Sequence, residues 1–139
     1  MLLESALMCM ALNMYHEARN QPNIGQLAVG QVVMNRVADS RYPNNVCAVV
    51  KQGRKYKNGT PMRNRCQFSW YCDGLSDEPK NKNEFERAQD NAIIVLNGWT
   101  GGMFDGATHY HADDVYPNWA SYKTFIVKIN THIFYRWEK

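Results

Sequence analysis

The sequence predicts an α+β fold, in which a helical core comes first and a small antiparallel sheet follows. Two observations lead to this prediction. Apolar side chains recur at helical spacing in three segments between residues 3 and 97, and they alternate with polar side chains in segments after residue 107. The 139 residues contain no internal repeat and no linker-like stretch, so we expect one domain covering residues 1–139.

The first two predicted helices cover residues 3–18 and 24–37. In the first, four apolar side chains form one stripe, and Pro22 ends the helix soon afterwards. The stripe consists of Leu3, Leu7, Met10 and Met14. Apolar side chains cover most of the second helix, so we expect it to be buried, and we expect its polar Gln31 and Asn35 to need hydrogen-bond partners.

The remaining elements follow from shorter patterns. We expect a short helix in VCAVVKQG that Gly53 ends, an exposed hairpin around the Asn-Gly turn of RKYKNGTPMR, and a polar loop in DGLSDEPKNKN. A third main helix is predicted over residues 84–97, with Gly98 beyond its end. The segments ATHYHADD, YKTFIVKI and THIFYR are predicted strands, the last two joined near Asn130.

Composition and charge narrow the class of protein. A hydrophobic content of 45% and a charged content of 21% are typical of a globular protein and not of a disordered one. The net charge of +3 suits a polyanionic surface such as a cell wall or nucleic acid. The apolar N-terminal segment lacks the basic start and small-residue cleavage site of a signal peptide. We therefore expect a protein made in the cytoplasm without a signal peptide.

The four cysteines, Cys9, Cys47, Cys66 and Cys72, leave two interpretations open. They are free buried thiols, as in a cytosolic protein, or Cys47 forms one disulfide with Cys66 or Cys72. No Cys-x-x-Cys pair occurs, so we do not expect a zinc knuckle.

Glu17 stands where the apolar stripe of the first helix calls for another apolar side chain. At about 100° per residue it projects beside Met10 and Met14. A carboxyl group held against apolar side chains resists ionisation, so its pKa rises from about 4.3 towards neutrality, as a general acid requires. The alternative is a surface glutamate that pairs with Arg19 or Arg36 and faces water.

Two further segments are candidates for a site. In HYHAD, His109 and His111 face one side of a predicted strand. One interpretation is a zinc site with Asp113 as the third ligand. The other is a hydrogen-bonding face that lines a polar groove.

In CQFSWYCDG, Gln67, Ser69 and Trp70 offer the amide, hydroxyl and aromatic groups of a carbohydrate groove. The alternative is a buried strand with Phe68 and Trp70 in the core.

Five segments together resemble a known family. ALNMYHEARNQPNIGQLAVGQVVMNRV, RYPNNVCAVV, CQFSWYCDG, ATHYHADDVYPNW and INTHIFYR occur in the order seen in the cell-wall hydrolases related to the spore-cortex lytic enzymes of germination, which include single-domain phage endolysins. The resemblance covers residues 11–136.

The resemblance implies a lysozyme-like fold and a single catalytic domain that cleaves the glycan strand of peptidoglycan, as a muramidase or a lytic transglycosylase. It implies that Glu17, in the HEAR motif, is the catalytic acid and that neither a metal nor another cofactor is needed. The substrate-binding residues that we expect are Asn35, Gln67, Ser69, Trp70, His109, Tyr110 and His111. The expected partner is the peptidoglycan glycan strand, and we expect a monomer to bind it. We expect no nucleic acid partner and no stable membrane insertion. Release through a membrane lesion, like that of a phage endolysin, fits this expectation.

One departure from the family bears on mechanism. Members often carry a second glutamate where this chain has Gln21, which suits a mechanism with one carboxylate. Asp73 is the rival second carboxylate, and we expect it instead to cap its own Asp-Gly turn. Two other functions stay open from the sequence: a zinc amidase or peptidase that uses His109, His111 and Asp113, and a non-catalytic module that binds the wall.

Overall fold

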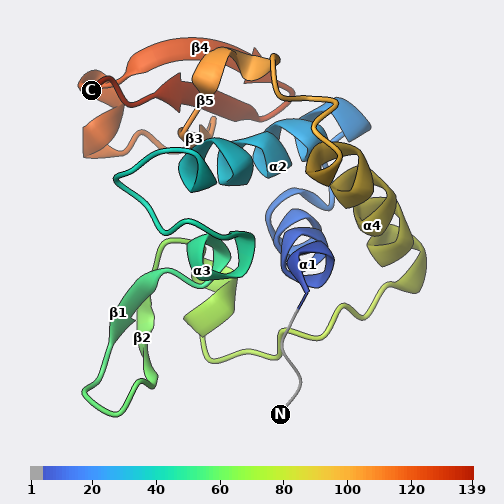
Figure 1. Cartoon of the computed structure of the whole chain (residues 1–139), viewed down its shortest axis with the longest axis vertical. Coiled ribbons are helices and arrows are strands. Elements are labelled where there is room, and N and C mark those ends of the chain that lie inside the picture. The colour runs from blue at the N-terminus through green and yellow to red at the C-terminus, as the bar shows by residue number, and fades with distance from the viewer. Residues whose placement is uncertain (1–4) are drawn as a thin grey trace.

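The computed structural model describes residues 5–139, which form an α+β fold as predicted. In Figure 1 the three-stranded sheet lies at the top, α2 runs beneath it, α1 and α4 lie below, and a two-stranded hairpin projects at the lower left. The α-helices are α1 (Ala6–Ala18), α2 (Asn23–Val37), α3 (Val46–Val50) and α4 (Lys82–Leu96). The strands are β1 (Gly53–Lys55), β2 (Pro61–Cys66), β3 (His109–Ala112), β4 (Thr124–Ile129) and β5 (His132–Arg136). Three short 3₁₀ helices are η1 (Ser69–Cys72), η2 (Phe104–Gly106) and η3 (Asn118–Ser121).

Helix α1 begins after Ser5, whose hydroxyl accepts a hydrogen bond of 3.0 Å from the amide of Met8 and so caps the first turn. Of the predicted apolar stripe, Met10 and Met14 are completely buried. Leu3, the first residue of that stripe, lies outside the described residues. The helix ends at Ala18, so Glu17 occupies its last turn.

Helix α2 is the central element of the helical core. It contacts α1, α3 and α4, and a side chain at Gly30 would overlap the terminal methyl group of Met14. Its polar Gln31 and Asn35 have partners, as expected: the Gln31 amide donates to Asn35 at 2.9 Å and accepts from the Thr100 hydroxyl at 2.6 Å. Because Gly30 has no side chain, α1 and α2 approach each other closely. This contact helps to place the end of α1 under the sheet.

The sheet is antiparallel with the strand order β3, β5, β4. One face packs on α2, where the buried Phe134 joins Val29 and Val32 in a second hydrophobic cluster. Strands β4 and β5 connect at Asn130, which has a positive φ of 52°. The three predicted strands and this connection are confirmed, but each strand is shorter than its predicted segment: the strands cover residues 109–112, 124–129 and 132–136, and the predicted segments cover 107–114, 122–129 and 131–136.

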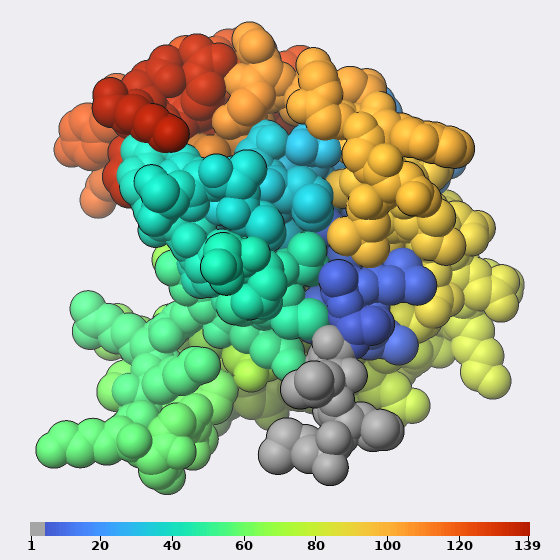
Figure 2. Space-filling model, viewed as in Figure 1, coloured from blue at the N-terminus to red at the C-terminus, as the bar shows by residue number. Residues whose placement is uncertain are grey.

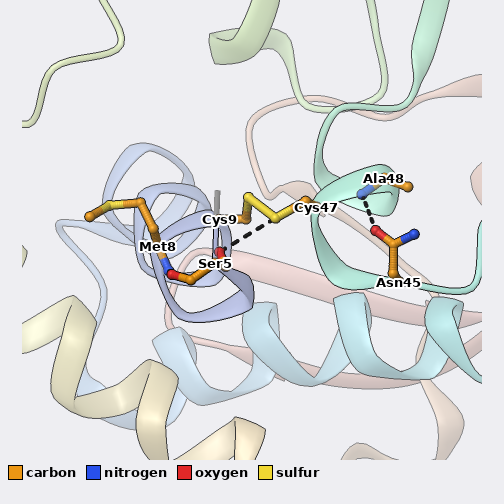
Figure 3. Close-up of a disulfide and its surroundings, with 6 residues drawn as sticks. All are labelled: Ser5, Met8, Cys9, Asn45, Cys47 and Ala48. Carbon is orange, nitrogen blue, oxygen red and sulfur yellow. Dashed lines mark hydrogen bonds between the residues drawn. A yellow bond between two sulfur atoms is a disulfide. The ribbon is translucent and has the colours of Figure 1, made fainter. Parts of the chain in front are cut away.

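Two disulfides link the helices and the hairpin, so both cysteine interpretations were wrong. Cys9 pairs with Cys47, which joins α1 to α3, and Cys66 pairs with Cys72, which joins β2 to η1. Figure 3 shows the first bridge, with the Cys47 sulfur also directed at the carbonyl of Ser5. The pairing depends on how the distant α1 and α3 pack, which the spacing of cysteines does not reveal.

The hairpin around the Asn-Gly turn is confirmed, but Gly53 does not end the short helix. Helix α3 ends at Val50, and Gly53 is the first residue of β1. A β-carbon at Gly53 would lie 2.8 Å from the Cα of Cys66, so the glycine lets the two strands approach each other.

Within residues 5–139, none of the helices has both the length and the apolar character needed to cross a membrane.

Candidate active site

The end of α1 and the sheet meet at Glu17. This glutamate is half-buried, and its Oε1 accepts a hydrogen bond of 2.6 Å from the hydroxyl of Tyr110 on β3. The ring of Tyr110 lies between the helices and β5, with its centroid 5.1 Å from that of His132 and 5.4 Å from that of Phe134. Packing against two rings of β5 and the hydrogen bond to α1 thus hold the tyrosine in place against the carboxyl group.

Burial raises the pKa of the Glu17 carboxyl, as the sequence predicted. The hydrogen bond from Tyr110 and the charges of His16 and Arg36 oppose part of that rise. No carboxylate is among these groups.

The alternative interpretation, a surface ion pair with an arginine, is wrong: the Arg19 guanidinium donates to the Tyr15 hydroxyl at 2.7 Å, and Arg36 donates to a carbonyl. Glu17 therefore has no arginine ion pair, and burial favours the protonated form of its carboxyl group.

Arg36 is a buried cation behind the Glu17–Tyr110 pair. Its side chain is 5% exposed, and its Nε donates to the Thr108 carbonyl at 2.8 Å. Its Nη1 has no hydrogen-bond partner among the described residues. Burial lowers the pKa of this guanidinium. From the sequence, Arg36 was considered only as an ion-pair partner, and no pattern in the sequence marks it as a buried charge next to the acid.

Residues from η1 form a second wall beside Glu17. The rings of Trp70 and His16 stack with centroids 4.6 Å apart, and the Trp70 indole donates to Asn13 at 2.9 Å. Trp70 is buried, so it supports His16 and does not offer an open ring face to a sugar. Gln67 and Ser69, in the same segment, are exposed.

The alternative interpretation of CQFSWYCDG is confirmed in one respect and wrong in another. Phe68 and Trp70 belong to the hydrophobic core, as that interpretation had it. The segment from Ser69 to Cys72 is, however, a 3₁₀ helix and not a strand. Cys66 and Cys72 are only 6 positions apart in the sequence, and an extended strand would hold them too far apart to form their disulfide.

The polar loop before α4 contacts His16 at the end of α1. The His16 Nε2 donates to the carbonyl of Asp77 at 2.8 Å. A hollow of about 200 Å³ opens here between the end of α1 and the loop. It is lined by Tyr15, His16, Arg19, Ser76, Glu78 and Lys80. The sequence did not predict that this loop packs against the end of α1, because its composition indicates only exposure.

The structure separates Tyr110 from the two histidines beside it. Alternate residues of a strand face opposite sides of the sheet, so Tyr110 faces Glu17 while His109 and His111 face away from it. The His111 Nδ1 donates to the Ala112 carbonyl at 2.7 Å, and its Nε2 accepts from the Tyr135 hydroxyl at 2.8 Å. His109 lies beside Trp119 instead, with ring centroids 5.1 Å apart. The structure therefore does not bring these two histidines to Glu17.

The surroundings of the two histidines do not suit a zinc ion. Burial, with the charges of Arg36, Lys123 and Arg41, lowers the pKa of His109 to about 3. Asp113, the proposed third ligand, pairs with Lys128 at 3.2 Å. Across residues 5–139, no three His, Cys, Asp or Glu side chains gather closely enough to hold a metal ion. The donor set that the zinc amidase or peptidase requires does not form.

Three other residues singled out in the sequence have hydrogen-bond partners other than Glu17. Asn35 donates to the Ala107 carbonyl at 2.8 Å and borders a separate hollow at the end of α2. Gln21 is 3% exposed and donates to the Thr131 hydroxyl at 2.7 Å, so it ties the link between α1 and α2 to the β4–β5 turn. Asp73 accepts a hydrogen bond of 2.9 Å from the amide of Leu75, which confirms that it caps its own turn.

Comparison with known proteins identifies the family. A family model described as Cell Wall Hydrolase matches residues 20–135. The chain belongs to this family of cell wall hydrolases. The matched range begins just after Glu17, so this match says nothing about that residue.

Relatives of this cell wall hydrolase are spore cortex-lytic enzymes. The enzyme of Bacillus cereus is 29% identical over 133 residues, which cover 94% of this chain and 44% of the relative. That of Bacillus subtilis is 26% identical over 125 residues, which cover 90% and 35%. The chain thus spans less than half the length of the curated relatives it matches.

A solved structure shares the fold of this cell wall hydrolase over almost its whole length. It is the catalytic domain of the germination-specific lytic transglycosylase SleB from Bacillus anthracis, with a TM-score of 0.74 and 27% identity, covering 97% of each chain. The predicted family and the predicted fold, helices with a small antiparallel sheet, are therefore confirmed.

Proposed function

We propose that the protein cleaves the glycan strand of peptidoglycan between N-acetylmuramic acid and N-acetylglucosamine, as a lytic transglycosylase. The observation that carries the proposal is the half-buried Glu17, whose carboxyl group has a raised pKa and accepts a hydrogen bond from Tyr110. The similarity to the catalytic domain of SleB, which is a lytic transglycosylase, supports the same reaction.

In this reaction Glu17 acts twice. The protonated carboxyl group gives its proton to the glycosidic oxygen, and the bond from that oxygen to C1 of the muramic acid breaks. The resulting carboxylate then takes the proton from the C6 hydroxyl of the same sugar while O6 bonds to C1. The product ends in 1,6-anhydromuramic acid, no water is consumed, and Glu17 is protonated again.

Burial favours the protonated form of Glu17, whereas Tyr110 and Arg36 favour its charged form, so the two steps draw on different groups. Burial favours the protonated acid that the first step needs. The Tyr110 hydroxyl and the buried charge of Arg36 stabilise the carboxylate that the first step produces. A single carboxyl group can therefore pass between both states without a second acid.

The proposal extends to the setting in which the enzyme works. Residues 1–139 act as a single catalytic domain and as a monomer on glycan strands of the bacterial cell wall. Nucleic acid, stable membrane insertion and a cofactor have no part in the proposed reaction. Tyr110, together with the exposed Gln67 and Ser69, contacts substrate, and Trp70 supports that wall from behind.

The test combines a variant with product analysis. Glu17→Gln keeps the shape and the acceptor for Tyr110 but removes the proton, so it should fold normally and lose lysis of purified peptidoglycan by at least about a hundredfold. Asp73→Asn, which makes the same chemical change in a turn, is the matched control and should keep its activity. Mass spectrometry of the wild-type products should show anhydro ends, which are one water lighter than reducing ends. A folded Glu17→Gln variant that still lyses the wall contradicts the proposal.

A further inference from the structure

The hairpin formed by β1 and β2 concentrates positive charge. Between Gly53 and Cys66 lie five of the 16 lysines and arginines and none of the 13 acids, so the rest of the chain, with 11 cations and 13 acids, has a net charge of −2. The five cations are Arg54, Lys55, Lys57, Arg63 and Arg65, and all are exposed. In Figure 2 the hairpin, in green, projects from the lower left of the molecule, away from the sheet.

Among residues 5–139, none of these five cations has an ion-pair partner. The ion pairs among residues 5–139 involve other cations, such as Arg87 with Glu84 and Lys128 with Asp113. Five like charges on one short hairpin repel one another, and that repulsion is relieved when an anion binds. The arrangement is typical of a surface that binds a polyanion.

The base of the hairpin is attached to the wall of the candidate active site. After β2, the amide of Gln67 donates to the Gln52 carbonyl at 2.9 Å, and the Cys66–Cys72 disulfide joins the strand to η1. Trp70 of η1 stacks on His16, the neighbour of Glu17. The hairpin is therefore joined through η1 to the segment that packs on His16, next to Glu17 in the sequence.

One side of the hairpin forms a hollow with an aromatic neighbour. Arg63 packs against Gly74, where a β-carbon would lie 2.8 Å from the arginine Nε. Arg63, Tyr71 and Leu75 are among the residues that line this hollow of about 370 Å³. A guanidinium group can bind a carboxylate through two parallel hydrogen bonds, and the tyrosine and leucine offer apolar contact to the chain that carries it.

We propose that the hairpin binds the carboxylates of the peptide stems on the glycan strand that Glu17 cuts. The inference rests on the proposed function, because it takes the substrate to be peptidoglycan. Continuity with the active-site wall favours a second part of the same substrate over nucleic acid. The hairpin thus adds affinity and orients the strand across the site, while the chemistry stays at Glu17.

Binding without cleavage tests this role directly. In a Glu17→Gln background, Lys55→Gln/Lys57→Gln/Arg65→Gln should weaken cosedimentation with peptidoglycan sacculi, stripped of phosphate polymers, by about tenfold in Kd at low salt, and the loss should shrink as salt rises. The matched control, Lys82→Gln/Lys128→Gln/Lys139→Gln, makes the same change in charge on α4, β4 and the C-terminus and should bind as before.

Two treatments of the ligand complete the test. Sacculi whose carboxylates have been converted to amides should bind the parent and the hairpin variant equally weakly. Unchanged binding of the hairpin variant, undiminished binding to amidated sacculi, or hairpin-dependent binding to duplex DNA that is as tight as to sacculi would overturn the proposal. Because this assay measures binding alone, its failure is distinct from a Glu17→Gln variant that still lyses the wall.

Discussion

The Glu17 carboxyl group is subject to two opposing influences. Burial favours its neutral form, whereas the Tyr110 hydroxyl, His16 and Arg36 favour its charged form. A residue that must first give a proton and then take one back needs both, because either influence alone would leave it fixed in one state. The close contact of 2.6 Å with Tyr110 makes that hydroxyl the partner whose removal is most informative.

Replacing Tyr110 with phenylalanine should lower activity by about tenfold to a hundredfold, the effect of losing a hydrogen bond to a charged group. The hydroxyl lowers the pKa of Glu17, so its removal raises that pKa. The acid then stays protonated to higher pH, and the alkaline limb of the kcat/KM profile should move to higher pH. Lysis rates measured between about pH 4 and pH 9 check this shift.

Tyr135→Phe is the matched control for this change. It removes a tyrosine hydroxyl from the same sheet, but that hydroxyl donates to His111 on the face turned away from Glu17. Its pH profile should coincide with that of the wild type. An alkaline limb that stays in place for Tyr110→Phe would mean that the hydrogen bond does not govern the protonation of Glu17.

At the scale of elements, the two disulfides hold the parts around the site together in different ways. Cys9–Cys47 closes a separation of 38 residues and joins α1 to α3, whereas Cys66–Cys72 closes a separation of 6 residues at the base of the hairpin. Bonds of this kind persist in oxidising surroundings, which agrees with the proposed action on a cell wall. The longer loop restricts the unfolded chain more strongly.

Cys9→Ala/Cys47→Ala should therefore lower the free energy of unfolding by about 4 kcal/mol, and Cys66→Ala/Cys72→Ala by about 2 kcal/mol, according to the loop-closure relation. Urea denaturation of the two double variants and the wild type measures the difference. Reduction of the wild type serves as the control, because it should reproduce the sum of both losses. A larger loss for the shorter loop would show that loop closure does not dominate the stabilisation.

The elements that the sequence predicted well are those whose patterns are local. Helical spacing located α1, α2 and α4 to within a few residues, and alternation located the three strands of the sheet. The cysteine pairs were not predictable, because they depend on which distant segments meet. The alternation that predicted β3 also places His109 and His111 on the face opposite to Tyr110. The prediction that all three residues bind substrate in one groove overlooked this consequence.

At the scale of the whole molecule, the site lies where three separate parts meet. Helix α1 carries Glu17, the sheet supplies Tyr110, and the polar loop around Asp77 and Glu78 reaches His16. The position of Glu17 against the core was predictable because this residue interrupts a local apolar stripe. The loop was not, since only the packed chain brings residues 76–80 next to α1.

This loop contains two carboxylates, Asp77 and Glu78, and Glu78 is the one that lines the hollow beside His16. Asp73, by contrast, is engaged in its own turn. A hydrolytic enzyme would use such a second carboxylate, about 5–5.5 Å from the acid if it retains the anomeric configuration and about 6.5–9.5 Å if it inverts it. The groups that shift the pKa of Glu17 are Tyr110, His16 and Arg36, none of which is a carboxylate, and the proposed reaction uses one acid that acts twice.

Glu78→Gln should accordingly keep lysis within a few-fold of the wild type, and its products should still end in 1,6-anhydromuramic acid. The amide keeps the size of the side chain and removes only its charge, so a changed outcome would reflect chemistry and not packing. Glu84→Gln, the same substitution on α4, controls for the loss of one negative charge. Muropeptides from all three proteins are compared by mass spectrometry. An inactive but folded Glu78→Gln, together with reducing ends as the main wild-type product, would establish hydrolysis by two carboxylates and leave Glu17 as the acid of that reaction.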